Sequence, residues 1–161
     1  FTISIFTENF IGLLNRVSIV FTRRHLNIES ITASESEITG VYRYTIVLTT
    51  TESQIKKVVK QLEKIVDVIK AFYHNDEETI FQEIALYKLR TSKFCQNNAE
   101  QLVRTHHARV LSMESDYIVI EKTGYKEETQ AFFEALQHIG VLEFARSGRV
   151  SITKPMKELA R

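Results

Sequence analysis

Hydrophobic residues in this chain switch between two spacings, and the order of the switches limits the folds that it can adopt. Residues 1–7 alternate polar and apolar, as in a half-buried strand. From residue 13 onward, apolar side chains recur on one face of a helix, at Leu13, Leu14, Val17, Val20 and Phe21. A strand pair, a second helix and a fourth strand are then expected at residues 27–34, 41–50, 51–64 and 65–73.

The same order of spacings returns in the second half. A strand, a helix, two paired strands, a helix and a last strand are expected at residues 80–89, 97–106, 108–113, 117–122, 126–139 and 141–153. Gly140 ends the long helix, and Ser147 and Gly148 interrupt the last strand. The order β-α-β-β-α-β, found twice, predicts an α+β protein with two tandem ferredoxin-like domains. We place them at residues 1–76 and 77–161, with a loose polar tail from residue 155.

Charge and cysteine content exclude several classes of protein. The chain has 21 basic and 20 acidic residues, mixed along its length, so we expect no nucleic-acid partner. It lacks the run of roughly 20 apolar residues that a membrane span needs, so we expect no membrane partner. Cys95 is the single cysteine and is expected in a polar turn. A lone thiol allows no internal disulfide and predicts a cytoplasmic protein.

Catalytic and metal-binding motifs are missing. No histidine pair has the i, i+4 spacing of a metal site on a helix, and there is no cysteine or carboxylate cluster to complete one. The nucleophile-elbow, P-loop and dinucleotide-binding glycine motifs are also missing. We therefore expect no catalytic site, no metal and no cofactor on this chain.

The connection from the first strand to the first helix is the most informative local feature. Gly12 opens the helix, where free backbone N–H groups and partial positive charge favour a carboxylate. Asn9 offers a donor and an acceptor, and Asn27 is expected near this loop. A free amino acid would find a carboxylate cradle and an acceptor for its ammonium group here. From physics alone, a plain tight turn that requires glycine is the better interpretation.

A second candidate lies near the end of the chain. Arg146 and Arg149 flank the Ser147-Gly148 turn, where they could bind an anion or form ion pairs with a partner chain. A solvated turn is the simpler interpretation on charge alone.

The residues around Gly12 belong to a longer pattern. It consists of Glu8-Asn9-x-x-Gly12-x-Leu14-x-Arg16-Val17, Phe21-x-x-Arg24-x-x-Asn27-Ile28-Glu29-Ser30, Gln61-Leu62-x-Lys64-x-Val66-Asp67-Val68, Glu83-Ile84-Ala85-Leu86-x-Lys88 and Ala145-Arg146-Ser147-Gly148. This pattern resembles the small regulatory subunits of acetolactate synthase (acetohydroxyacid synthase), whose N-terminal domain is an ACT domain. The resemblance spans nearly the whole chain, which makes it far more specific than an ACT motif alone.

The resemblance implies a role. Such subunits bind and activate the large catalytic subunit and confer feedback inhibition by branched-chain amino acids, valine above all. Thiamine diphosphate, Mg²⁺ and FAD belong to the catalytic subunit. The ACT domains pair as a homodimer, with effector sites at their interface. Carried over by position, the effector-site residues are Asn9, Gly12, Leu13, Leu14, Asn27 and Ile28.

This resemblance reverses the preference for a plain turn at Gly12. Arg146 becomes a candidate contact to the catalytic subunit. Leu13 departs from the family, which usually has a smaller residue after the glycine. We therefore expect Leu13 to narrow the pocket or to change which amino acid fits.

Two other classes stay open. The chain could be an ACT-domain amino-acid sensor for a different enzyme, which failure to bind any acetolactate synthase catalytic subunit would favour. A ferredoxin-like RNA-binding module would need exposed aromatic residues on its central strands with basic residues around them. Tyr42 and Tyr44 lie on such a strand, but no RNA-binding motif surrounds them, and we expect no shift with RNA.

Overall fold

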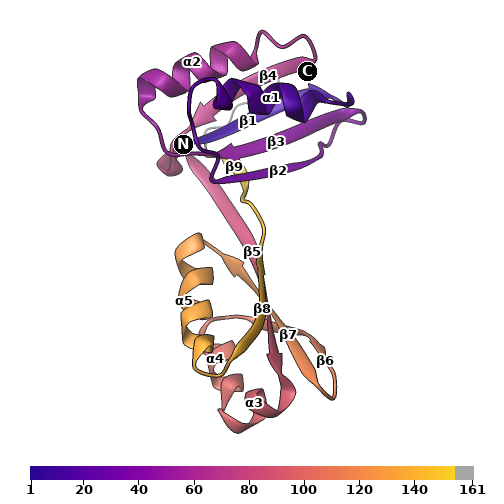
Figure 1. Ribbon diagram of the computed structural model, residues 1–161, viewed down its shortest axis with the longest axis vertical. Helices are drawn as coiled ribbons and strands as arrows, with labels where there is room; N and C mark the ends of the chain where they lie inside the picture. Colours follow the sequence, from indigo (N-terminus) through magenta and orange to yellow (C-terminus); the bar gives the residue numbers. More distant parts are fainter. Residues whose placement is uncertain (155–161) are drawn as a thin grey trace. The chain divides into compact units, whose positions relative to one another are not determined.

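The computed structural model describes residues 1–154, and they form two compact units. The first unit contains Phe1–Ile80 together with the segment that begins at Arg149, and the second contains Phe81–Gly148. Figure 1 shows the elements of each unit in sequence colours. The tail that we expected to be loose, residues 155–161, lies outside the described residues.

The first unit is a four-stranded antiparallel sheet with two helices. Its elements are β1 (Thr2–Glu8), α1 (Leu13–Thr22), β2 (Ser30–Glu35), β3 (Val41–Val47), α2 (Glu52–Leu62), β4 (Val68–His74) and the 3₁₀ helix η1 (Asp76–Glu78). The strand order is β2-β3-β1-β4. Figure 1 shows α1 and α2 on the same face of this sheet.

The core of this unit lies between the sheet and the two helices. Ile3 and Ile5 on β1 point toward the helices because side chains two residues apart share a face of a strand. The stripe Leu13, Val17 and Phe21 buries one face of α1 against them. Helix α2 begins at the N-cap Thr51, whose hydroxyl accepts a hydrogen bond from the Gln54 N–H (3.3 Å).

The opposite face of this sheet is covered by the returning strand β9 (Val150–Thr153), which also pairs with β5. Arg43 on β3 donates to the Ser151 carbonyl and to the Ser4 hydroxyl (3.3 Å). The Arg149 guanidinium donates to the Thr2 hydroxyl (3.0 Å) and pairs with Asp76 (2.6 Å). The C-terminal segment is thus part of the first unit's fold.

The second unit repeats the topology. Its elements are β5 (Thr79–Arg90), which begins in the first unit, α3 (Thr91–Gln96), α4 (Ala99–Thr105), β6 (Arg109–Met113), β7 (Tyr117–Gly124), α5 (Lys126–Gln137) and β8 (Val141–Arg146). The strand order β6-β7-β5-β8 matches that of the first sheet. The predicted fold class, two tandem ferredoxin-like units, is confirmed.

Tyr87 occupies the centre of the second core. It is fully buried on β5, packs edge-on against Phe132 (ring centroids 4.9 Å apart) and donates its hydroxyl proton to the Thr129 carbonyl (2.6 Å). Burial raises the pKa of Tyr87 to about 12, because the phenolate would have to form away from water.

Three features differ from the sequence prediction. Helix α3 was not predicted, because it has only six residues and buries only Phe94; Cys95 therefore lies on this helix rather than in a turn. The expected single strand over residues 141–153 is two strands, β8 and β9, which lie in different units. The compact units consequently differ from the predicted division at residue 76, since the segment from Arg149 packs with the first unit.

The hydroxyl of Tyr87 generates a prediction about pH. Of the six tyrosines, one should ionise only near pH 12, and Tyr87→Phe should remove that step from an ultraviolet titration. The folded-state pKa lies above the ordinary value of 10.0, so the folded state holds the extra proton between these pH values. The free energy of unfolding should therefore fall as pH rises from about 10 to about 12. Ionisation of all six tyrosines together near pH 10 would contradict this.

The covering strand generates a stability prediction. Arg149→Ala should destabilise the first unit by about 1.5–3 kcal/mol, because hydrogen bonds from a charged donor are lost at a buried face. Hydrogen exchange of the β1 and β3 amides measures this in the intact chain. The exposed Arg90 is the control, and its replacement by alanine should change stability by no more than about 0.5 kcal/mol. Equal protection in Arg149→Ala and wild type would show that β9 does not hold this face.

Candidate functional site

The β1–α1 connection is held between two other turns of the first unit. The Glu8 N–H donates to the Asp67 carbonyl (3.0 Å), and the Asn9 N–H donates to the Gly40 carbonyl (3.2 Å). The loop therefore lies beside the start of β4 on one side and the β2–β3 turn on the other. Its backbone is fixed while the Asn9 side chain remains exposed.

Gly12 is the N-cap of α1 and takes the left-handed conformation, with φ 81°. No side chain caps the helix there. The Leu13 N–H donates to the Phe10 carbonyl (3.3 Å), and the Leu14 and Asn15 N–H groups keep their capacity for an outside acceptor. A Cβ added at Gly12 would meet no atom within 4 Å. The glycine is thus required by the backbone conformation rather than by close packing, and the helix end is open to a ligand.

Apolar side chains surround this helix end without being buried. Phe10 is 60% exposed, Ile11 is 99% exposed and Leu14 is 48% exposed. Isolated apolar residues on a surface are ordinary, but here they stand together at an uncapped helix N-terminus. The loop offers an apolar wall next to free N–H groups.

Leu13 is placed differently from the expectation that it narrows the pocket. Its side chain is 1% exposed and belongs to the first hydrophobic core, with Val17 and Phe21 on the same helix face. Position 13 is the first residue of the buried stripe of α1, so its side chain points away from the surface. A ligand at the helix end would not touch it.

Asn27 and Ile28 do not lie near the loop within one chain, which corrects the expectation for Asn27. Strand pairing sets Thr2 of β1 and Ser30 of β2 level with each other, both opposite Val47. Asn27 precedes Ser30 and so lies at the start of β1, whereas Asn9 and Gly12 follow its end. The two groups are separated by about the length of β1, roughly 20 Å at ~3.4 Å per residue. Asn27 is exposed, and Ile28 packs partly against the core.

Arg146 is engaged inside the second unit. Its Nε atom lies 3.0 Å from Glu83 Oε1, and its Nη2 atom donates to the Gln130 side chain (3.0 Å). Most of the side chain is buried, and Thr129 donates to the same Glu83 oxygen. The structure thus gives Arg146 an internal partner, and its contact to a catalytic subunit stays a prediction.

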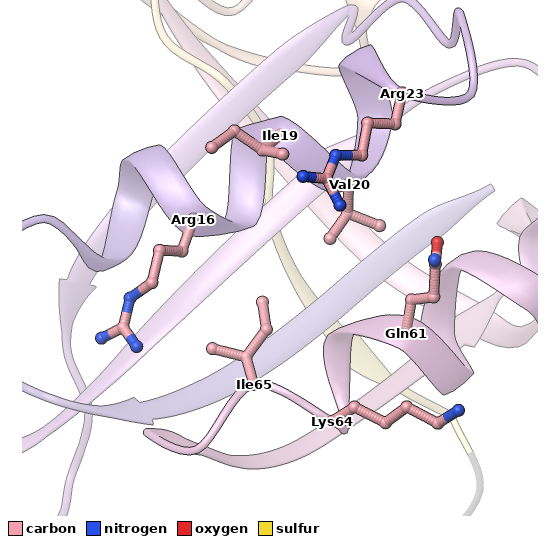
Figure 2. A pocket seen from close by; sticks show the side chains of 7 residues that line it. All are labelled: Arg16, Ile19, Val20, Arg23, Gln61, Lys64 and Ile65. Atoms are coloured by element: carbon pink, nitrogen blue, oxygen red, sulfur yellow. The ribbon is translucent and has the colours of Figure 1, made fainter.

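An open groove of about 370 Å³ lies between α1 and the end of α2. Figure 2 shows the seven residues that line it: Arg16, Ile19, Val20, Arg23, Gln61, Lys64 and Ile65. The sequence prediction does not include this groove. A second stripe on α1, at Arg16, Val20 and Arg23, has the i, i+4, i+7 spacing of one helix face and was the available signal.

Two features of residues 1–154 concern metals and membranes. Within residues 1–154, no three histidine, cysteine or acidic side chains gather as metal ligands would. No helix in the same range is long and apolar enough to span a membrane.

Comparison with known proteins places both halves of the chain. Residues 3–70 match the family described as "AHAS small subunit-like ACT domain", and residues 82–155 match "Small subunit of acetolactate synthase". The acetolactate synthase small subunit of Mycolicibacterium smegmatis is 32% identical over 153 residues, covering 95% of this chain and 90% of that protein. The small subunit of Bacillus subtilis is 32% identical over 150 residues, covering 92% and 87%.

A solved structure agrees with these matches. The crystal structure of the acetolactate synthase small subunit from Thermotoga maritima has 30% sequence identity and a TM-score of 0.86, and the match covers 95% of this chain and 96% of that one. Fold and sequence therefore agree: the chain shares the fold of a solved small subunit, and its sequence matches these relatives over almost their full length. The chain belongs to the family of acetolactate synthase small subunits, and its first unit is an ACT domain.

Proposed function

We propose that this chain is the regulatory subunit of an acetolactate synthase, and that it activates the catalytic subunit and inhibits it when valine or a related branched-chain amino acid binds. The family supports the partner, and the uncapped N-terminus of α1 at Gly12 is the observation that supports effector binding. Thiamine diphosphate, Mg²⁺ and FAD are part of the proposal as cofactors of the catalytic subunit. The cytoplasmic location stays a prediction.

The chemistry of an amino acid fits the exposed groups of the first unit. The free N–H groups at the start of α1 suit its carboxylate, since a helix N-terminus carries partial positive charge. The side-chain oxygen of Asn9 or Asn27 can accept from its ammonium group. Phe10, Ile11 and Leu14 offer a surface for an aliphatic side chain. In this proposal, Leu13 supports the site from the core, because it is 1% exposed and its N–H donates to the Phe10 carbonyl (3.3 Å).

Two copies of the chain would bring the separated residues together. Strand β2 is an edge strand, and its sequence Ser-Ile-Thr-Ala-Ser-Glu carries no proline or lysine to discourage pairing. Antiparallel pairing of β2 with β2 of a second copy sets the start of one strand beside the end of the other. Asn27 of one copy would then lie on the same side as Gly12 of the second copy. The proposed effector site is therefore shared between copies of a homodimer.

A shared site gives the effector a means of regulation. An amino acid can shift the balance between activating and non-activating states only if it binds them unequally. A ligand that contacts both copies does so when their relative orientation changes. The required coupling free energy is about 1–3 kcal/mol in typical allosteric proteins.

The runner-up is an ACT-domain sensor that regulates a different enzyme. The same loop geometry would serve it, so only the partner discriminates the two functions. Matches to acetolactate synthase small subunits over both halves of the chain favour the first proposal.

The central measurement is acetolactate formation by the catalytic subunit, with and without this chain, across a valine titration. We expect the chain to raise the rate and valine to remove most of that gain. Activation without suppression by valine, leucine or isoleucine would leave activation standing and contradict the effector site. A folded chain that neither binds nor activates the catalytic subunit would favour the sensor of a different enzyme.

Subunit mixing tests the shared site. Gly12→Asp places a carboxylate at the helix end, and Asn27→Ala removes the amide, so either homodimer should lose feedback but keep activation. A heterodimer of the two variants has one doubly altered site and one intact site. Co-expressed chains with two affinity tags should therefore bind valine at half the wild-type stoichiometry, by calorimetry. A site within one chain would give no binding.

Gly140→Asp is the matched control for the glycine substitution. Gly140 also has a positive φ, 96°, and open space around a built Cβ, but it follows α5 in the second unit. It therefore carries the same backbone strain without touching the proposed site, and it should keep full valine feedback. Loss of feedback in Gly140→Asp as well would show that strain rather than position causes the effect.

A further inference from the structure

The groove between α1 and the end of α2 combines an apolar floor with a basic rim. Ile19, Val20 and Ile65 supply the floor, and Figure 2 shows Val20 and Ile65 facing each other across the space between the helices. Arg16 lies toward one end, while Arg23 and Gln61 lie toward the other. Gln61 is held in place by the Arg24 side chain, which donates to its oxygen (2.7 Å).

The groove carries a local excess of positive charge. Over the whole chain 21 basic residues balance 20 acidic ones, yet the lining contains cations and no carboxylate. Arg16 is paired with Asp67. Arg23 and Lys64 are exposed, and neither side chain has an acidic partner in the described part of the chain. Two rim cations are therefore available for carboxylates from outside.

The exposure of the lining favours a surface segment over an enclosed small molecule. None of the seven lining residues is buried, and Ile19 is 37% exposed. Small-molecule sites usually enclose most of their ligand, whereas an amphipathic helix lays its apolar face into an open groove of this kind. Docking would remove the apolar side chains of the floor from water and would give the rim cations acidic partners.

A second copy of this chain is a poor occupant. Two grooves brought face to face would oppose Arg23 and Lys64 with the same cations, and like charges across an interface are unfavourable. The groove also lies between the helices, away from the edge strand β2 that the homodimer would use.

We infer that this groove docks an amphipathic segment of the catalytic subunit, with an apolar face against Ile19, Val20 and Ile65 and carboxylates that reach Arg23 and Lys64. The inference rests on the proposed function, which supplies the partner, and adds the surface and the chemistry of contact. Electrostatic attraction at the rim should make the docking depend on salt.

The test is the affinity of the catalytic subunit for the full chain, measured by biolayer interferometry at low and at moderate salt. Arg23→Glu/Lys64→Glu should raise the Kd at least about tenfold and flatten its salt dependence, because both rim attractions become repulsions. Arg23→Lys/Lys64→Arg keeps both charges and should bind nearly as wild type does. Circular dichroism melts check that each variant is folded.

The control reverses two charges on α2 that lie outside the groove. Lys57 and Lys60 are exposed on α2 and do not line the groove, so Lys57→Glu/Lys60→Glu should bind much more tightly than the groove variant. Equal Kd values for the two double variants would overturn the inference and leave the proposed function standing. Failure of the wild-type chain to bind would overturn both. A groove variant that loses affinity for inorganic phosphate yet binds the catalytic subunit normally would identify a small-anion site instead.

Discussion

The antiparallel pairing of β1 with β3, continued by β2, is the constraint on which the rest of the first unit depends. It sets Thr2 and Ser30 level, so the β1–α1 loop and the start of β2 must lie at opposite ends of the sheet. Residues that match one effector-binding pattern are thereby divided into two groups on one chain. Because side chains cannot reach across roughly 20 Å, a site that uses both groups needs a second copy, and the edge position of β2 leaves room for one.

Local spacing was sufficient to predict most of the elements. Helices α1, α2 and α5 follow from stripes of apolar residues such as Leu13, Val17 and Phe21, because one turn of helix is set by a few neighbouring residues. Gly140, expected to end α5, takes a positive φ of 96°, a backbone conformation that glycine commonly adopts just after a helix. Gly12 was likewise found from the sequence, since its conformation depends on the turn that it occupies.

The arrangement of the site depends on contacts between distant residues, which spacing does not report. Leu13 packs in the core with Val17 and Phe21, although its position in the sequence pattern suggested that it lines a pocket. Arg146 on β8 pairs with Glu83 on the neighbouring strand β5, a partner that is 63 positions away in the sequence and that local spacing does not indicate. Strand β9 packs with the first unit, where Arg43 donates to the Ser151 carbonyl and Arg149 donates to the Thr2 hydroxyl. No local signal in the sequence distinguishes β9 from a continuation of β8.

Arg16 joins the two surfaces to which we assign functions. Its side chain pairs with Asp67, lies over the Phe10 ring (6.0 Å to the centroid) and lines the groove. The Asp67 carbonyl also holds the loop through the Glu8 N–H. An effector that reorders Phe10 therefore changes the surroundings of Arg16 directly, at one end of the groove. Within the first unit, effector binding and docking to the catalytic subunit would be linked through a single side chain, without a route through the second unit.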